Sequence, residues 1–208
     1  MADHRLTAQS LTCVRERRTL FSSLNLSLSP GRVLLVEGFN GAGKTSLLRI
    51  LCGLSQPREG AVLWDGEDIR ECRWTYHHGL LYIGHSAGTK LELTPVENLR
   101  FLGALGGRPA DDEVLVEALG AVGLEGYEDL PVRMLSAGQR RRVALARLWV
   151  NSAPLWILDE PLTAIDRRGV SNLSMRIREH IQSGGLAVLT SHQPLELASI
   201  RIERLTLG

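Results

Sequence analysis

The sequence predicts an α/β fold in which a parallel β-sheet is interrupted by a helical segment. Two observations lead to this prediction. Two continuous apolar runs, at residues 155–158 and 187–190, have the composition of strands buried on both faces of a parallel sheet. Between the early and late strands, the stretch from about residue 86 to 152 is helical in pattern. We therefore expect a single domain over residues 1–208, with an inserted helical subdomain at residues 86–152.

Length and composition narrow the class of protein. The chain has 208 residues, a net charge of +1 and a pI of about 7.8. It therefore lacks the strong positive electrostatic field that attracts nucleic acid. The three cysteines lack CxxC or zinc-site spacing and are expected to be reduced thiols. No apolar stretch approaches the roughly 20 residues of a membrane span, and no signal peptide is evident. We expect a cytosolic chain that meets a membrane only through a partner.

The individual elements are predicted from local patterns. The first 36 residues alternate apolar runs with turns and predict strands at residues 24–28 and 33–36, and a further strand at residues 61–64 precedes the turn Asp65-Gly66. Thr94 and Glu97 form a capping-box pattern with proline at the first helical position. An acidic-led helix follows from residue 111. A second capping box at residues 136–139 is expected to open a helix over residues 140–150.

A glycine-rich loop with the spacing G-x-x-x-x-G-K-T lies between a predicted strand and an apolar helical stretch. This context is typical of a loop that binds a nucleoside triphosphate, because its N–H groups and the helix N-terminus attract phosphate. Lys44 is expected to reach the β- and γ-phosphates, where it acts in catalysis, and Thr45 to bind Mg²⁺. The predicted binding residues of the loop are Gly38, Phe39, Asn40, Gly41, Ala42, Gly43, Lys44, Thr45 and Ser46.

Two acids end the apolar strand at residues 155–158. Ligands of such sheets lie at the carboxyl ends of the strands. Asp159 is therefore expected to hold Mg²⁺, directly or through water, and Glu160 to orient and deprotonate a water that attacks the γ-phosphate.

The segment at residues 135–139, Leu-Ser-Ala-Gly-Gln, resembles the LSGGQ signature of the ATP-binding cassette (ABC) family and differs from it only at Ala137. Pro161 completes the LDEP pattern of that family, residues 162–166 resemble its D-loop, and His192 stands where its switch histidine does. These motifs span most of the chain. The resemblance implies a P-loop NTPase (ABC ATPase) core with an N-terminal antiparallel β subdomain and an inserted α-helical subdomain.

The resemblance also implies that ATP, with Mg²⁺, is hydrolysed between two copies of the chain. Glu160, His192 and Lys44 would be catalytic, and Thr45 and Asp159 would hold the metal. Further contacts to the nucleotide are implied for Ser136, Gly138, Gln139, His85 and Asp166. Ser136 and Gly138 would come from the second copy.

Two positions depart from the family pattern. His85 replaces a glutamine in the loop that joins the core to the helical subdomain, and imidazole suits Mg²⁺ less well than an amide oxygen. We expect it to act as a loop anchor. The aromatic residue that stacks on adenine is also missing from residues 13–16, where the guanidinium of Arg15 could stack instead. The run Arg140-Arg141-Arg142 is expected to be a solvated surface with one structural contact, because successive helical residues face different directions.

The local sequence of several segments, around residues 82–99 and 141–161, resembles that of the ATP-binding subunits of cytochrome c maturation systems. This resemblance implies haem delivery or export through a separate integral membrane subunit, with peripheral attachment to the cytoplasmic face of the inner membrane. Three alternatives stay open at this stage. They are a soluble ABC ATPase of DNA maintenance or translation, an ATP-binding subunit for another transported substrate, and a catalytically inactive interaction module.

Overall fold

The computed structural model describes residues 5–191, 197 and 200–208, and these residues form two compact units. The first unit contains residues 1–82, 153–160 and 178–208, and the second contains residues 83–152 and 161–177. Helix α6 (Arg167–Gln182) contributes to both. We describe each unit by itself.

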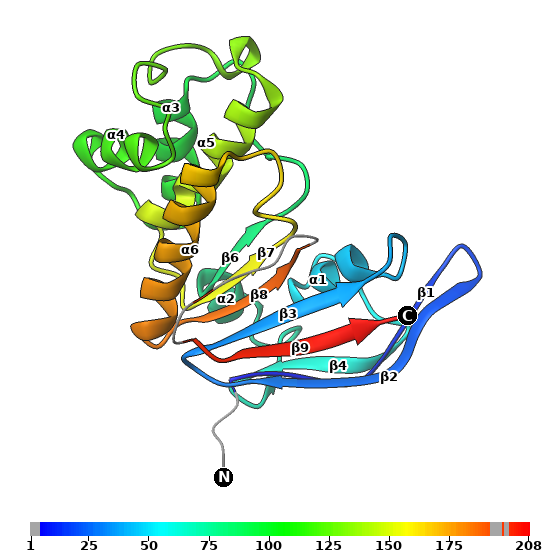
Figure 1. Cartoon of the computed structure of the whole chain (residues 1–208). Helices are drawn as coiled ribbons and strands as arrows, with labels where there is room; N and C mark the ends of the chain where they lie inside the picture. The colour runs from blue at the N-terminus through cyan, green and yellow to red at the C-terminus, as the bar shows by residue number, and fades with distance from the viewer. Residues whose placement is uncertain (1–4, 192–196, 198–199) are drawn as a thin grey trace. The chain divides into compact units, whose positions relative to one another are not determined.

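The first unit contains an antiparallel sheet made from the N-terminal part of the chain (Figure 1). Its strand order is β2-β1-β4-β5. The strands are β1 (Leu6–Arg15), β2 (Arg18–Leu28), β4 (Glu59–Trp64) and β5 (Glu67–Asp68). This sheet confirms the expected N-terminal antiparallel β subdomain. A strand was predicted only for the last part of β2, because register shifts between β1 and β2 interrupt the period-two alternation earlier in the hairpin.

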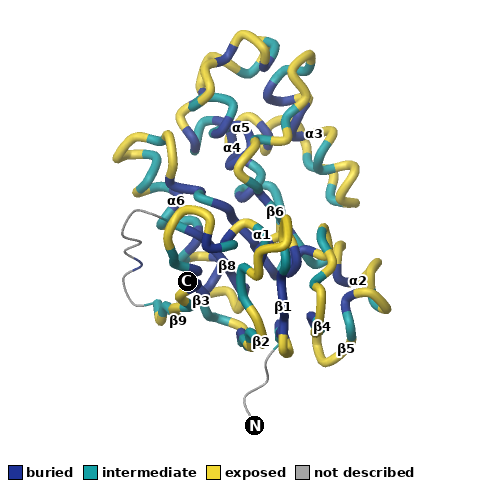
Figure 2. The backbone as a smooth tube through the Cα atoms, turned by 90° about the vertical axis from the view of Figure 1, so that its right-hand side faces the viewer, coloured by how far each residue is buried: buried dark blue, intermediate teal, exposed yellow. Residues whose placement is uncertain are grey.

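The second sheet of this unit has the order β6-β7-β8-β3-β9. Its strands are β3 (Arg32–Gly38), β6 (Leu80–Ile83), β7 (Leu155–Leu158), β8 (Leu186–Thr190) and β9 (Ile202–Leu207). Strand β8 pairs in parallel with both β7 and β3, and β3 pairs in parallel with β9. Every residue of β7 and β8 is buried, as predicted from their continuous apolar runs. Figure 2 colours the backbone by burial and labels β8.

One hydrophobic core joins the two sheets with helix α1 (Lys44–Leu51). Leu6 and Leu11 of β1, Leu47 of α1 and Ile157 of β7 all belong to it and have no exposed surface. The short helix α2 (Arg73–His78) adds Tyr76, which lies edge-on to Trp64 and donates a hydrogen bond to the carbonyl of Leu51. The core therefore fixes α1, whose first residue closes the glycine-rich loop.

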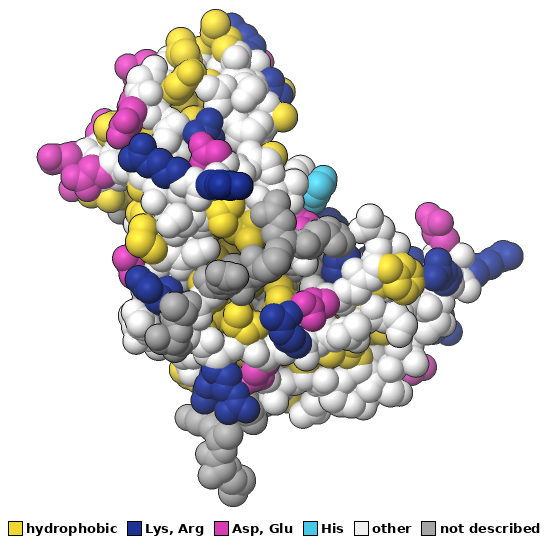
Figure 3. All heavy atoms as spheres, viewed as in Figure 1, with side chains coloured by type: hydrophobic (Ala, Val, Ile, Leu, Met, Phe, Trp, Pro, Cys, Tyr) yellow, Lys and Arg dark blue, Asp and Glu magenta, His cyan; other side chains and the backbone are white. Residues whose placement is uncertain are grey.

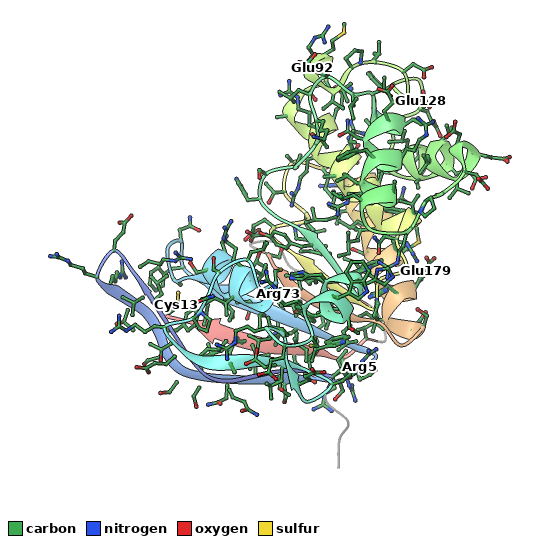
Figure 4. The ribbon with its side chains drawn as sticks, turned by 180° about the vertical axis from the view of Figure 1, so that it is seen from behind. Arg5, Cys13, Arg73, Glu92, Glu128 and Glu179 are labelled. Atoms are coloured by element: carbon green, nitrogen blue, oxygen red, sulfur yellow. The ribbon has the colours of Figure 1, made fainter. Side chains whose placement is uncertain are left out.

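The second unit is helical, as predicted. Its helices are α3 (Pro95–Leu105), α4 (Asp112–Ala121), the 3-10 turn η1 (Val132–Met134) and α5 (Ala137–Val150). Both predicted capping boxes are present, at Thr94 with Glu97 and at Ser136 with Gln139. Helix α5 starts three residues before the predicted residue 140, because the Ser136 cap leads directly into the first turn. On the surface, Glu92, labelled in Figure 4, pairs with Arg133 at 2.7 Å.

A tight contact in the first unit generates a stability prediction. A Cβ atom at Gly185 would lie 2.3 Å from ring atoms of His180. That imidazole stacks on Trp156 at 3.7 Å between centroids, and its Nε2 lies 3.2 Å from the carbonyl of Leu186, so the ring has little room to retreat. We expect Gly185→Ala to lower the free energy of unfolding by about 1–3 kcal/mol through overpacking.

Chemical denaturation of the full chain measures this effect. The control is a double-mutant cycle with His180→Ala, which removes the ring that meets the new methyl group. Strictly additive losses in the double variant would show that the contact with the ring is not the cause.

Candidate active site

The glycine-rich loop joins the end of β3 to the start of α1 and depends on glycine at two points. A Cβ at Gly38 would lie 2.4 Å from the carbonyl oxygen of Leu207 in the neighbouring strand β9, so no other residue fits there without movement. Gly43 precedes α1 with φ of 101°, in the left-handed region that glycine tolerates. Helix α1 therefore begins with N–H groups that no side chain caps, which suits an anion.

Lys44 is the first residue of α1, and its side chain lies along the glycine-rich loop. The residue is only 9% exposed, and its ammonium group donates hydrogen bonds to the carbonyls of Gly38 at 2.7 Å and Phe39 at 3.3 Å. A cation held in this way by main-chain oxygens has a fixed position over the loop. It can therefore receive phosphate oxygens without a large rearrangement.

A hydrogen-bonded chain connects the loop to the two predicted acids. The hydroxyl of Thr45 donates to Oδ2 of Asp159 at 2.9 Å, and the hydroxyl of Thr190 donates to Oδ1 of the same carboxylate at 2.8 Å. Asp159 is 2% exposed, so both hydroxyls matter to its buried charge. The backbone N–H of Glu160 donates to the Thr190 hydroxyl at 2.8 Å. Lys44, Thr45, Asp159 and Glu160, which lie far apart in the sequence, thus belong to one compact unit.

The β1–β2 hairpin lies beside the glycine-rich loop. A Cβ at Gly43 would be 3.1 Å from Cβ of Leu20 and 3.4 Å from Cδ1 of Phe21, both in β2. Arg15, at the exposed end of β1, donates a hydrogen bond to the hydroxyl of Ser55 at 3.1 Å. The guanidinium that could stack on adenine in place of an aromatic ring is therefore bonded to a residue of a neighbouring loop.

In the helical unit, the signature residues begin α5. The Ser136 hydroxyl accepts from the N–H of Gln139 at 3.2 Å, and the side chain of Gln139 accepts from the N–H of Ser136 at 2.8 Å. Ala137 is the first helical residue, a place where alanine costs nothing. A Cβ at Gly138 would lie 3.1 Å from the carbonyl of Ala164, so here glycine allows close approach of the D-loop backbone.

The three arginines that follow make more structural contacts than the single one that the sequence suggested. Each donates to main-chain carbonyls of another segment of the helical unit. Arg140 donates hydrogen bonds to the carbonyls of Leu135 and Arg133. Arg141 donates to those of Gly84 and His85. Arg142 donates to those of Gly123 and Val122. Arg141 is 7% exposed. The expectation of one structural contact was too low because the acceptors are backbone atoms, which leave no signal in the sequence.

The remaining predicted residues differ in what the structure says of them. His85 is exposed, and its carbonyl lies 3.4 Å from a guanidinium nitrogen of Arg141, so the loop is held through its backbone. Asp166 accepts a hydrogen bond from the N–H of Gly169 at 2.7 Å at the start of α6. His192 lies outside the described residues.

Comparison with known proteins identifies the family. The family model described as "ABC transporter" matches residues 21–163, more than half of the chain. The chain belongs to the ABC transporter family. It is an ABC-type ATPase, so it binds ATP, and the predicted resemblance to this family is confirmed.

Two curated relatives of this ABC ATPase cover nearly its whole length. The cytochrome c biogenesis ATP-binding export protein CcmA of Escherichia coli K12 is 52% identical over 97% of this chain and 96% of its own. The protein of the same name from Methylococcus capsulatus is 53% identical over 95% of both chains. The expected resemblance to the cytochrome c group of ABC ATPases is therefore also confirmed.

Solved structures agree on the fold of the ABC ATPase. A putative ABC transporter ATP-binding protein from Pyrococcus furiosus superposes with a TM-score of 0.82 over 98% of this chain and 97% of its own, at 22% identity. A dimeric post-hydrolysis ATP-binding cassette with ADP and Pi gives the same TM-score over 97% and 96%, at 22% identity. The expected fold class is confirmed.

Three further features of the ABC ATPase are its surface charge, a buried thiol and the character of its helices. On the face drawn in Figure 3, acidic and basic side chains are interspersed and do not gather into a patch of one sign. Burial raises the pKa of the Cys52 thiol well above its usual range, so this group is a poor nucleophile. Among the described helices, none combines the length and the apolar character that crossing a membrane demands.

The buried Arg141 generates a prediction for the ABC ATPase. Replacing it with alanine would leave the carbonyl of Gly84 without its donor and empty the space of the guanidinium stem. We expect Arg141→Ala to lower the free energy of unfolding by about 1–3 kcal/mol. Urea denaturation of the full chain measures this change.

The matched control is Arg167→Ala, which removes an exposed arginine at the start of α6. This substitution is expected to stay within about 0.5 kcal/mol of the wild type. Equal losses in the two variants would contradict a specific role for the contact with the loop at residues 84–85.

Proposed function

We propose that this ABC ATPase is the ATP-hydrolysing subunit of an export system in cytochrome c biogenesis. The support is the full-length similarity to proteins named for that role, together with the presence in this chain of the residues that are predicted to carry hydrolysis. In this proposal the chain works through a separate integral membrane subunit, at the cytoplasmic face of the inner membrane. The transported or delivered group is haem, and an ATP-binding role for another substrate is the alternative.

The observation that carries the hydrolytic part is the partly buried hydrogen bond between Thr45 and Asp159. Mg²⁺ prefers oxygen ligands. Here the Thr45 hydroxyl oxygen and a carboxylate oxygen of Asp159 lie 2.9 Å apart beside the glycine-rich loop. The donor set therefore fits Mg²⁺, with Thr45 and Asp159 as its ligands. When bound with ATP, the ion would neutralise charge on the β- and γ-phosphates.

Different residues of the chain would bind the phosphates and activate the attacking water. The loop from Gly38 to Ser46 would cradle the phosphates with its N–H groups, and Lys44 would bind the β- and γ-oxygens. Glu160 would accept a proton from the attacking water and hold it in line. His192 would hold water and base together. General base catalysis of this kind is worth about 10²–10⁴-fold in rate.

The second half of each nucleotide site would come from another copy of the chain. Ser136 and Gly138 of that copy would contact the γ-phosphate from the N-terminus of α5, and Gln139 and Asp166 would flank the nucleotide. In support, the cap leaves α5 with a rigid start, and the dimeric cassette of similar fold is named as bound to ADP and Pi. The loop of His85, held by Arg141 of α5, would pass motion to the membrane subunit.

Purification from membranes tests the proposal as a whole. The chain, purified in mild detergent, is expected to bring an integral membrane protein with it and to release phosphate from ATP. Cells that carry only Lys44→Ala should lose c-type cytochromes, measured by haem staining of covalently bound haem. Normal levels of c-type cytochromes in those cells would contradict the proposed role in cytochrome c biogenesis.

We further predict that Glu160→Gln slows ATP hydrolysis by at least ~10²-fold while the affinity for ATP is kept, because the amide binds similarly but cannot take a proton. The variant should also accumulate as an ATP-bound dimer, which size-exclusion chromatography with and without ATP detects. Lys44→Ala is the control and should neither hydrolyse nor dimerise. A monomeric Glu160→Gln protein with wild-type turnover would show that the base lies elsewhere.

A further inference from the structure

Thr190, the last residue of β8, is a polar residue with no exposed surface. The sequence presents it only as the end of an apolar run, and none of the roles proposed above uses it. Its backbone is fixed by parallel pairing, with Val36 of β3 opposite it. A hydroxyl placed so deep, next to the carboxyl ends of β3 and β7, needs partners for both its proton and its lone pairs.

The Thr190 hydroxyl has such partners on both predicted acids. It donates to Oδ1 of Asp159 at 2.8 Å and accepts from the backbone N–H of Glu160 at 2.8 Å. The other carboxylate oxygen of Asp159 accepts from Thr45. The Thr190 and Thr45 hydroxyls therefore hold the plane of the Asp159 carboxylate from its two oxygens.

The bond to Glu160 acts on the backbone at an unusual point. Glu160 has φ of +51°, in the left-handed region that side chains with a Cβ disfavour. Its N–H lies in the peptide plane that joins Asp159 to Glu160. Holding that N–H fixes the plane from which the Glu160 side chain departs, so the bond supports a conformation that the chain alone would avoid.

We propose that Thr190 is a positioning residue that aligns the metal-binding carboxylate of Asp159 and the base Glu160 with a single hydroxyl. It touches neither ATP nor the attacking water. The proposal rests on the roles given above to Asp159 and Glu160. It adds that the two acids are set together, so loss of one hydroxyl disturbs both.

The test compares Thr190→Val, Thr190→Ser and Thr190→Ala in the full chain purified with its membrane partner. Valine keeps the shape of threonine without the hydroxyl, and serine keeps the hydroxyl without the methyl group. We expect Thr190→Val to lower kcat at least about tenfold, a part of what a positioned base contributes, with KM for ATP changed less than about twofold. Thr190→Ser should keep kcat within about threefold of the wild type.

A second readout does not depend on turnover. The free Mg²⁺ concentration that gives half of the ATP-induced rise in melting temperature should increase several-fold in Thr190→Val and stay near wild type in Thr190→Ser. A residue that is merely structural would lower the melting temperature of both variants and leave kcat at saturating ATP and the Mg²⁺ dependence unchanged.

The outcomes separate this inference from the proposed function. Wild-type kcat and Mg²⁺ dependence in Thr190→Val, with Glu160→Gln inactive in parallel, would overturn the positioning role alone. An active Glu160→Gln would overturn the proposed function itself. If Thr190→Val does not fold, Thr190→Ala and Thr190→Ser decide, because they differ by one oxygen atom. The serine variant should be at least about tenfold faster, and equal rates would overturn the proposal.

Discussion

The parallel register of β7, β8 and β3 is the constraint on which the site depends. Leu158 of β7 lies opposite Leu189 of β8, and Leu35 of β3 lies opposite the same residue on the other side. Because all three strands run in the same direction, whatever follows them emerges at one edge of the sheet. Asp159, Thr190 and the glycine-rich loop therefore meet there. A shift of one residue in either pairing would turn these side chains to the other face.

Residues whose role depends on local chemistry could be predicted from the sequence. The glycine-rich loop, the two capping boxes and the acids that end β7 each carry a short-range pattern whose physical reason lies within a few residues. The structure confirms the elements that carry them. It also explains why Ala137 can stand in the signature, since that position is an ordinary first helical residue, whereas Gly138 approaches the backbone at Ala164.

Residues whose role depends on distant backbone atoms could not be predicted. Thr190 looks like the end of an apolar strand until its hydroxyl is seen to bond the Asp159 carboxylate and the backbone N–H of Glu160, which follow another strand. The arginines of α5 look like a charged surface for a similar reason. The left-handed φ of Glu160 could not be predicted either, because glutamate has no preference for that conformation. Such features come from the tertiary fold and not from residue type.

The anchoring of α5 has a consequence for how the family can diversify. Its three arginines bind main-chain carbonyls, which every amino acid provides. The segments whose carbonyls accept these hydrogen bonds can therefore change their side chains during evolution. The helix that bears the signature keeps the same hydrogen bonds. A histidine in place of glutamine at position 85 is a change of this kind. The arrangement separates the helix that bears the signature from loops whose side chains are free to change.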